Sequence, residues 1–385
     1  MAASRKDLRK TNERLVLQEI IGNGPLSRSQ ISRNLNLNKV TVSEILNDFV
    51  SQQYVIEVGT GDSTKNGGRR PTLLTLNPKY GYYINIDLGP DHIKLMSTYL
   101  NGSIQQFTEI KNNNLSIDEI VALLKKQIKD NEIEDTLHSL LGISVAFYGI
   151  VYNNQVSYSP FLNLNSIDLA KILTDEFDAP VIICNEANAN AIYQRDFNYD
   201  DDCHNLICIS LHKGVGAGII LNDNLYLGTS GEAGEIGNMI IKHDKKDKLV
   251  RAETYCSESN VINYLREITD QPNLSLASIA DMYTFNRNPD VTKTLKEFTF
   301  NLADIVNNVI VAYAPQKIVF VSELLEAIPN LLIDVKKHIH QLTKHNTPLQ
   351  ISNNIKYSTQ LGSYSLLLRQ TFNLGKGKIN LSSNN

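Results

Sequence analysis

The sequence predicts an α/β protein in which a small helical head, residues 1–80, precedes a larger body, residues 81–385. Three short amphipathic segments followed by a hairpin fill the head, an order typical of a winged helix-turn-helix. Beyond residue 78, apolar strands alternate with helical segments, and two strands run into glycine-rich turns. Because one apolar core stops growing near ~250–300 residues, a chain of 385 residues is expected to hold two or three domains.

The composition is that of a globular protein. Hydrophobic residues make up 42% and charged residues 20% of the chain, and the longest apolar runs are far shorter than the ~20 residues that span a bilayer. No charged-then-apolar leader opens the sequence, so we expect a soluble cytoplasmic protein without a membrane partner. Cys184, Cys203, Cys208 and Cys256 form no Cys-x-x-Cys pair, which favours reduced structural thiols.

The charges are unevenly distributed. Residues 1–80 carry 12 Lys and Arg against 7 Asp and Glu, a net charge of +5, while the remaining residues carry 25 against 34, a net charge of –9. A basic head on an acidic body suits a module that binds a polyanion, joined to a domain with another task.

The head has clear helix signals. A first helix is expected from about Asn12 to the Gly-Asn-Gly-Pro turn at residues 22–25. Ser27 and Gln30 form a capping box that begins a second, short helix. Asn38 can cap a third helix. Its apolar residues fall at i, i+3, i+4 and i+7 and form one stripe against the first two helices: Val42, Ile45, Leu46 and Phe49.

The opposite side of the third helix carries a lysine and short polar side chains, which can reach base edges and phosphates in a major groove. Any one of these residues could equally belong to a solvated helix face. The pattern as a whole predicts binding to double-stranded DNA. The residues expected to contact DNA are Ser27, Arg28, Lys39, Thr41, Ser43, Glu44 and Asn47.

Residues 54–58 and 72–76 predict the two strands of the wing, because they are rich in β-branched and aromatic residues. The loop between them ends in a Gly-Gly-Arg-Arg-Pro arm at residues 67–71. Its flexible glycines present Arg69 and Arg70, which suit a phosphate backbone or a narrow minor groove. A solvated linker is the alternative interpretation.

The body carries several motifs in a fixed order. The strand at residues 82–89 ends in Asp87-x-Gly89-x-Asp91, and a second glycine-rich turn lies at residues 210–218. Between them, the strand at residues 181–185 delivers Asn185 and Glu186 to the start of a helix of small residues. An amide and a carboxylate at the end of a strand suit hydrogen bonds to vicinal hydroxyls.

Farther along the chain, an apolar stripe at residues 298–310 predicts a helix and residues 317–321 predict a strand. The polar tail, residues 375–385, is expected to fray.

Taken together, these segments resemble the ROK family (repressors, open reading frames, kinases) from about residue 81 to the end. With the head and its arm, nearly the whole chain is similar to the xylose repressor branch of that family. The resemblance implies a two-lobed, actin-like sugar-kinase (ribonuclease H-like) ATPase fold. Residues 81–190 would form the first lobe, and residues 191–385 a second lobe with the sugar cleft and the dimer contacts, whose last helix returns to the first lobe.

The resemblance also implies that the kinase chemistry is lost. Family kinases have Asn-Asp where this chain has Asn185-Glu186, and the aspartate is their general base. A glutamate moves the carboxylate by more than ~1 Å, and a misplacement of that order can cost ~100-fold in rate. Pro90 removes an N–H from the first phosphate turn. His212 and Lys213 replace the kinase Gly-Thr, so no catalytic residue is expected.

The sugar-facing positions are better preserved. By the resemblance, Glu235 and Glu253 match the family's sugar-contacting glutamates, and a sugar pocket is expected from Asn185, Glu186, Glu235, Asn238 and Glu253. Asn238 stands where the family has a histidine that touches the sugar, and the cysteine cluster that holds a supporting zinc in the family does not follow it here. We therefore expect neither a metal nor a cofactor.

The sequence thus predicts a repressor that binds operator DNA as a homodimer, with a tetramer as the alternative assembly. It releases the DNA when a small sugar, xylose above others, enters the body. Two alternatives stay open. One is an active sugar kinase with an appended DNA-binding head. The other, suggested by the missing zinc cluster, is a DNA-binding regulator that does not respond to sugar.

Overall fold

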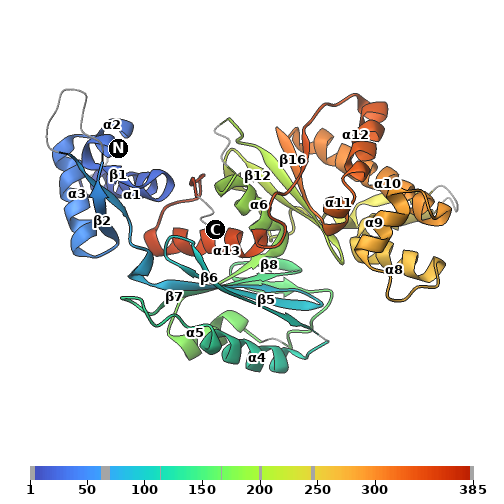
Figure 1. Cartoon of the computed structure of the whole chain (residues 1–385), viewed down its shortest axis with the longest axis horizontal. Coiled ribbons are helices and arrows are strands. Elements are labelled where there is room, and N and C mark those ends of the chain that lie inside the picture. The colour runs from blue at the N-terminus through green and yellow to red at the C-terminus, as the bar shows by residue number, and fades with distance from the viewer. Residues whose placement is uncertain are drawn as a thin grey trace.

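The computed structural model describes residues 5–61, 70–112, 114–165, 167–198, 202–243 and 248–381. These residues form a small head and a body built on two five-stranded sheets, with α6 and α13 packed together between the sheets (Figure 1). The elements of the head are α1 (Arg5–Asn23), β1 (Leu26–Ser27), α2 (Arg28–Asn34), α3 (Lys39–Ser51), β2 (Val55–Thr60) and β3 (Thr72–Leu76).

The predicted caps of the head are present. Ser27 and Gln30 make both hydrogen bonds of a capping box at the start of α2, and the Asn38 side chain accepts the Val40 N–H at the start of α3. The predicted apolar stripe of α3 is buried against α1 and α2 at Val42, Ile45 and Leu46. These local signals therefore fix how α3 sits in the head.

The first sheet of the body has the strand order β10-β7-β4-β5-β6. Its inner strands β10, β7 and β4 are parallel, so their carboxyl ends meet at one edge. The helices α4 (Ile117–Asp130) and α5 (Leu169–Phe177) lie on one face, and α13 (Ser358–Phe372) lies on the other (Figure 1). The strands of this part are β4 (Tyr82–Leu88), β5 (His92–Tyr99), β6 (Ile104–Lys111), β7 (Leu140–Phe147) and β10 (Val181–Asn185), with the hairpin β8 (Ile150–Tyr152) and β9 (Gln155–Tyr158).

The second sheet has the order β13-β12-β11-β16-β17. Its strands are β11 (Leu206–Leu211), β12 (Val215–Leu221), β13 (Asn224–Leu225), β16 (Lys317–Val321) and β17 (Leu349–Ile351). The helix α6 (Glu186–Asp196) packs against β11 and β12, while the largest apolar core lies beneath α8 to α12. Those helices are α8 (Glu258–Ile268), α9 (Leu276–Thr284), α10 (Pro289–Tyr313), α11 (Glu323–Ala327) and α12 (Asn330–Thr343).

Small residues allow α6 to pack closely on both sides. A Cβ at Gly362 of α13 would lie 1.8 Å from the Ala189 carbonyl oxygen, and a Cβ at Gly218 of β12 would lie 2.3 Å from that of Ala187. Glycine is thus required at both contacts, and every residue of α6 is buried. The helix that starts at Asn185 and Glu186 is held rigidly between the two sheets.

The head is packed directly on the body. Apolar residues of α1, α2, α3 and the wing share one buried cluster with residues of α13 and of the chain end. In this contact the ring of Tyr54 lies 4.6 Å from that of Tyr80 and 5.2 Å from that of Phe372, measured between centroids. Because the contact is direct, a movement within the body can change the position of the head.

Three expectations about the elements need correction. The first helix begins at Arg5, seven residues before the expected start, because Arg9 binds Glu13 one turn on and Asp48 of α3. The lobe boundary placed at residue 190 falls inside α6. Residues 375–381 of the tail are held in place rather than frayed, and Ile379 is buried.

The expected helix over residues 298–310 is part of α10, and the strand at residues 317–321 is β16. All four cysteines are buried thiols. Among the described helices, none combines the length and the apolar character needed to cross a bilayer.

Candidate functional site

The outward face of α3 is accessible in the head. Lys39, Glu44 and Asn47 are exposed, on the side opposite the buried stripe. Val40 belongs to the same outward face and is 64% exposed. The sequence analysis missed Val40 because it considered only polar residues. Its helical spacing to Glu44 and Asn47, at i+4 and i+7, could have revealed it.

Arg28 connects α2 with the outward face of α3. Its Nη1 donates to the Asn47 Oδ1 at 2.9 Å and to the Ser43 carbonyl oxygen at 3.1 Å. The side chains of Arg28 and Asn47 are therefore already oriented before a ligand binds, which lowers the entropy cost of binding. Thr41 and Ser43 are only half-exposed, so they reach outward less than expected.

Ser27 requires a correction. It is 2% exposed, and its hydroxyl is hydrogen-bonded to the side chains of Gln30 and Ser29. The structure makes it a helix-capping residue and leaves it no surface to offer DNA.

In the wing, β2 and β3 pair in antiparallel register, and Arg70 is exposed directly before β3. Arg69 and the two glycines of the arm lie outside the described residues. The expectation for Arg69 therefore stays a prediction.

In the body, two carboxylates near the carboxyl ends of strands of the first sheet each contact a histidine: Asp87 in β4 and Glu186 directly after β10. Asp87 near the end of β4 is buried, and its Oδ2 lies 3.2 Å from the His92 Nε2, while the His92 Nδ1 lies 2.9 Å from the Asp91 Oδ1. Burial opposes the charge on His92, but the bonds to Asp87 and Asp91 outweigh it and raise the pKa of His92 to about 9. The same bond lowers the pKa of Asp91 to about 2.

Glu186, the residue at the kinase base position, is engaged from three sides. Its Oε1 accepts hydrogen bonds from the Ser210 hydroxyl at 2.7 Å and the Asn190 amide at 2.5 Å, and lies 3.4 Å from the His212 Nε2. Burial again opposes the imidazolium, yet Glu186 raises the pKa of His212 to about 9. A carboxylate held in this way by donors is a poor general base.

Tyr148 lies between the two histidines. Its ring centroid is 6.0 Å from that of His92 and 5.8 Å from that of His212, both edge-on. Tyr148 follows the end of β7, next to the ends of β4 and β10. The sequence analysis missed both Tyr148 and His92, although the carboxyl ends of parallel strands are where ligand groups gather.

His92, Tyr148 and His212 line a cleft of about 900 Å³ between the first sheet and α8. Four basic residues line it as well, together with acidic residues such as Glu258: Lys94, Lys111, Lys213 and Arg266. Burial raises the pKa of Glu258 to about 7, against hydrogen bonds from the Ser322 hydroxyl and the Leu324 N–H. The cleft is thus lined by both basic and acidic side chains.

The expected sugar-facing residues fall into two groups. Asn185 and Glu186 begin α6, and the Asn185 side chain accepts the Asn188 N–H and donates to the Gly149 carbonyl. The second group is Glu235 and Glu253, next to the second glycine turn. The Glu253 Oε2 lies close to the backbone of two glycines: a Cβ added at Gly214 would be 3.5 Å from it, and one added at Gly237 would be 3.3 Å from it.

Glu235 is the carboxylate of the second group whose protonation its surroundings affect. Burial, then Glu253 and Glu232, raise the pKa of Glu235. Hydroxyl groups that donate to these oxygens would relieve the repulsion. Asn238 is exposed, at the end of the short turn of residues 236–238.

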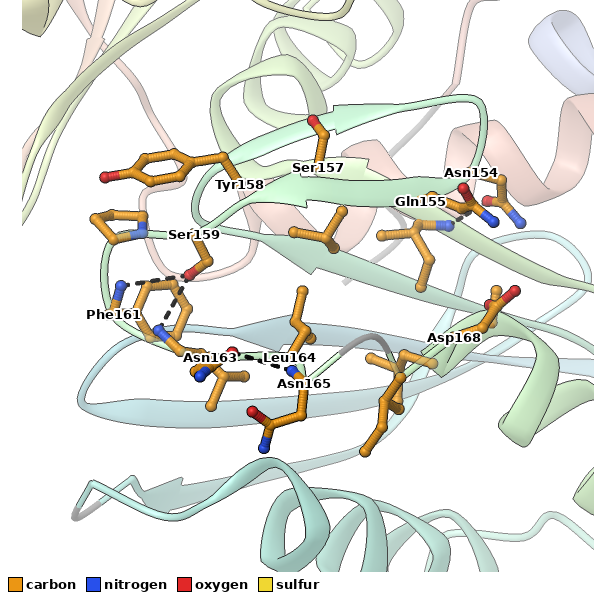
Figure 2. A pocket seen from close by; sticks show the side chains of 17 residues that line it. Asn154, Gln155, Ser157, Tyr158, Ser159, Phe161, Asn163, Leu164, Asn165 and Asp168 are labelled. Carbon is orange, nitrogen blue, oxygen red and sulfur yellow. Dashed lines mark hydrogen bonds between the residues drawn. The ribbon is translucent and has the colours of Figure 1, made fainter.

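A second cavity, of about 740 Å³, lies in the first lobe between the β8–β9 hairpin and the loop that leads to α5 (Figure 2). Most of its polar groups already serve the loop itself. Ser159 accepts the N–H groups of Phe161 and Leu162, the Asn163 oxygen accepts the Asn165 N–H, and Asp168 caps α5. Asn154 is bound to the backbone of β10. This cavity is rich in polar groups but presents few that are free.

Among the residues that the structure describes, no three His, Cys, Asp or Glu side chains gather in a way that could hold a metal ion.

The model of the ROK family matches residues 83–364. This chain belongs to the ROK family. The xylose repressor of Lactiplantibacillus pentosus is 35% identical over 365 residues, which cover 94% of each chain. A solved ROK family transcriptional regulator, a homologue of the Escherichia coli MLC protein, matches 95% of this chain and 97% of its own with a TM-score of 0.76 at 20% identity.

A ROK family glucokinase from Streptomyces griseus, solved with glucose and AMPPNP, covers 74% of this chain and 99% of its own with a TM-score of 0.62 at 17% identity. The predicted sugar-kinase fold of the body is thus confirmed.

Proposed function

We propose that this protein is a transcriptional repressor of a sugar-utilisation operon, that xylose is its inducer, and that it acts in the cytoplasm as a homodimer. One observation carries the proposal. A capped helix with an open outward face is packed on a kinase-fold body whose base-position carboxylate is bound by His212. The match to a xylose repressor along both head and body supports the same assignment.

In this proposal the head binds operator DNA. Lys39, Glu44 and Asn47 face the bases, Arg28 orients Asn47, and Thr41 and Ser43 contribute from the flanks of the helix. Arg69 and Arg70 of the wing contact the backbone or the minor groove. Two heads in a dimer would read half-sites spaced by one helical turn or a multiple of it.

The body binds the sugar and catalyses no phosphoryl transfer. The Glu186 Oε1 already accepts hydrogen bonds from Ser210 and Asn190 and lies 3.4 Å from the His212 Nε2, and such contacts stabilise the ionised carboxylate and make it a weaker base. Pro90 has no N–H for a phosphate, and His92 lies against the Asp87 carboxylate. We assign the sugar hydroxyls to Asn185, Glu186, Glu235, Asn238 and Glu253, of which Glu253 also lies 3.6 Å from the Arg251 guanidinium.

Regulation follows from a shift of populations. Xylose must bind one arrangement of the two lobes more tightly than the other, and that arrangement must place the heads out of register with the half-sites. A sugar with equal affinity for both arrangements would regulate nothing.

The DNA-binding part of the proposal is tested by selecting binding sites from a pool of random duplexes. The expected product is a pseudo-palindrome with half-sites about one turn, or a multiple of it, apart. Enrichment of no sequence would contradict it. The kinase alternative is tested separately, by incubating the protein with ATP, Mg²⁺ and each of several sugars, where any sugar phosphate formed would overturn the assignment of a non-enzyme.

The sugar pocket has its own test in Glu253→Gln. The variant is expected to bind operator DNA as the unaltered protein does and to lose its response to xylose, because an amide cannot accept the same hydrogen bonds as a carboxylate. A variant that still responds fully would remove Glu253 from the pocket.

A further inference from the structure

The last described residues, 374–381, form a strap that runs between the head and the second lobe. Figure 1 shows the end of the chain in this position, beyond α13 and close to α6. Leu374 and Ile379 are 2% exposed and Leu381 is 9% exposed, so the strap is a packed part of the fold. Gly375 begins it with φ +80°, a backbone conformation that favours glycine.

On one side the strap is bound by a buried ion cluster. Asp196, the last residue of α6, is 2% exposed, and it accepts hydrogen bonds from Arg195 at 2.8 Å and from Arg369 of α13 at 2.8 Å. Asp196 also accepts the Ile379 N–H at 3.1 Å through its side chain and the Leu381 N–H at 2.7 Å through its carbonyl oxygen.

The two arginines complete the clamp. Arg195 donates to the Lys376 carbonyl at 2.9 Å, and Arg369 donates to the carbonyls of Gly375 at 3.0 Å and Gly377 at 2.5 Å. Three carbonyl groups of the strap, at residues 375–377, thus accept hydrogen bonds from the two arginines, and two N–H groups, at residues 379 and 381, donate to Asp196. Such a buried cluster tolerates little change in geometry, because a buried charge without its partner is costly.

On the other side the strap lies on α1 of the head. The Gln18 amide donates to the Leu374 carbonyl at 3.0 Å. A Cβ at Gly22 would lie 2.9 Å from the Asn380 carbonyl oxygen, so the two backbones are in direct contact there. Leu374, Ile379 and Leu381 share one apolar cluster with the buried residues of α1.

One helix therefore joins the candidate ligand site to the strap. α6 starts at Glu186, next to Asn185, and ends at Asp196, and all of its residues are buried. A displacement of its first turn by a ligand would move Asp196 along with it, since a buried helix shifts as a unit.

We propose that the strap, residues 374–381, is the element through which α6 sets the position of the DNA-binding head, with Asp196 as the positioning residue. This inference rests on the proposed function, because it names how the body's ligand changes DNA binding. The contact of Tyr54 with Phe372 gives the head a second support that does not involve α6.

The most selective test is Gly22→Ala in the full chain. The added methyl group lies on the surface of α1 and pushes against Asn380 of the strap, while the side chains of the ion cluster and of the ligand site keep their identity. Alanine is also the better helix former, so α1 itself should not weaken. The matched control is Gly377→Ala within the strap, where a Cβ meets no atom within 4 Å. Asp196→Asn is the second variant and acts on the opposite side of the strap.

Three quantities are measured for each protein: the affinity for D-xylose by calorimetry, the ratio of operator Kd with and without xylose, and the loss of affinity when the spacing between half-sites is changed. Allosteric ratios are typically 5–150-fold. Gly22→Ala and Asp196→Asn should keep xylose affinity within about twofold and reduce the ratio several-fold toward one. They should also tolerate altered half-site spacing, whereas the control should behave as the unaltered protein does.

Unchanged ratios and unchanged spacing dependence in both variants would overturn the strap proposal. If the unaltered protein binds DNA but does not respond to xylose, the proposed inducer is wrong, and the spacing assay alone then decides on the strap. A loss of thermal stability confined to Asp196→Asn would leave Gly22→Ala as the deciding variant, because its change lies outside the cluster.

Discussion

At the scale of single residues, two histidines are the most informative groups of the body. His212 and His92 line the cleft, and each is paired with a buried carboxylate, Glu186 and Asp87. The sequence predicted the loss of kinase chemistry from Glu186, Pro90 and His212. It could not predict that His212 binds Glu186, since Glu186 begins α6 and His212 follows β11, and the two meet only when α6 packs on that strand.

These pairs predict a pH dependence of stability. The pKa of His212 rises from 6.5 to about 9 on folding, so the folded state holds this proton more tightly than the unfolded chain. The stabilisation is fully present below about pH 6.5 and is lost as the pH rises through about 9. His92 acts in the same direction and over the same range.

The check is urea unfolding of the unaltered protein and of His212→Gln between pH 7.5 and 9.5, a range above the titration of Glu258. The unaltered protein should lose stability more steeply with pH than the variant. Equal slopes would mean that His212 carries no charge in the folded protein.

Val40 leads to a second prediction at this scale. An exposed valine at the start of a recognition helix can contact the methyl group of a thymine. Replacing that thymine by uracil should weaken binding of the unaltered protein by about fourfold, from ~0.8 kcal/mol for one buried methyl-sized group. Val40→Ala should bind both operators alike. Val311→Ala, an exposed valine on α10, is the control. A uracil penalty of the same size in Val40→Ala would exclude this contact.

At the scale of elements, the local signals were the most predictive. The capping box at Ser27 and the cap at Asn38 placed α2 and α3, because both depend on side chains within three residues of the helix start. The strand β1 has only two residues and exists through its pairing with β3, which no local pattern records. The tail looked frayed because its binding partners, Arg195 and Asp196, lie far away in the sequence.

The wing is the element whose DNA contact remains a prediction. Replacing Arg69 and Arg70 by alanine should weaken binding to specific and random DNA alike. It should also reduce the steepness of log K against log salt by about 1 to 2, since each phosphate contact contributes ~0.9. The control is the replacement of the exposed Arg287 of the body by alanine, which changes the net charge without altering the head and should leave the salt dependence unchanged. If the slope stayed unchanged in the wing variant, the arm would be a solvated linker.

At the scale of the whole molecule, head and body form a connected structure. The α/β class, the winged head and the kinase-like body could be predicted, because each rests on periodicity or on motifs in a fixed order. The assignment of the site residues stays a prediction, and the sequence could not reveal that Asn185 and Glu186 already have hydrogen-bond partners within the chain. The path from α6 through the tail to α1 depends on contacts between residues more than 170 positions apart, and only the structure reveals it.

The central claim is that a sugar in the body controls DNA binding by the head. It is tested most directly by measuring the affinity for an operator fragment at fixed salt with and without D-xylose, beside L-arabinose, D-glucose and N-acetylglucosamine. We expect D-xylose alone to weaken binding, by a factor within the 5–150-fold range typical of allosteric coupling. Tight binding that no sugar changes would contradict the account and favour a regulator whose body has lost its ligand.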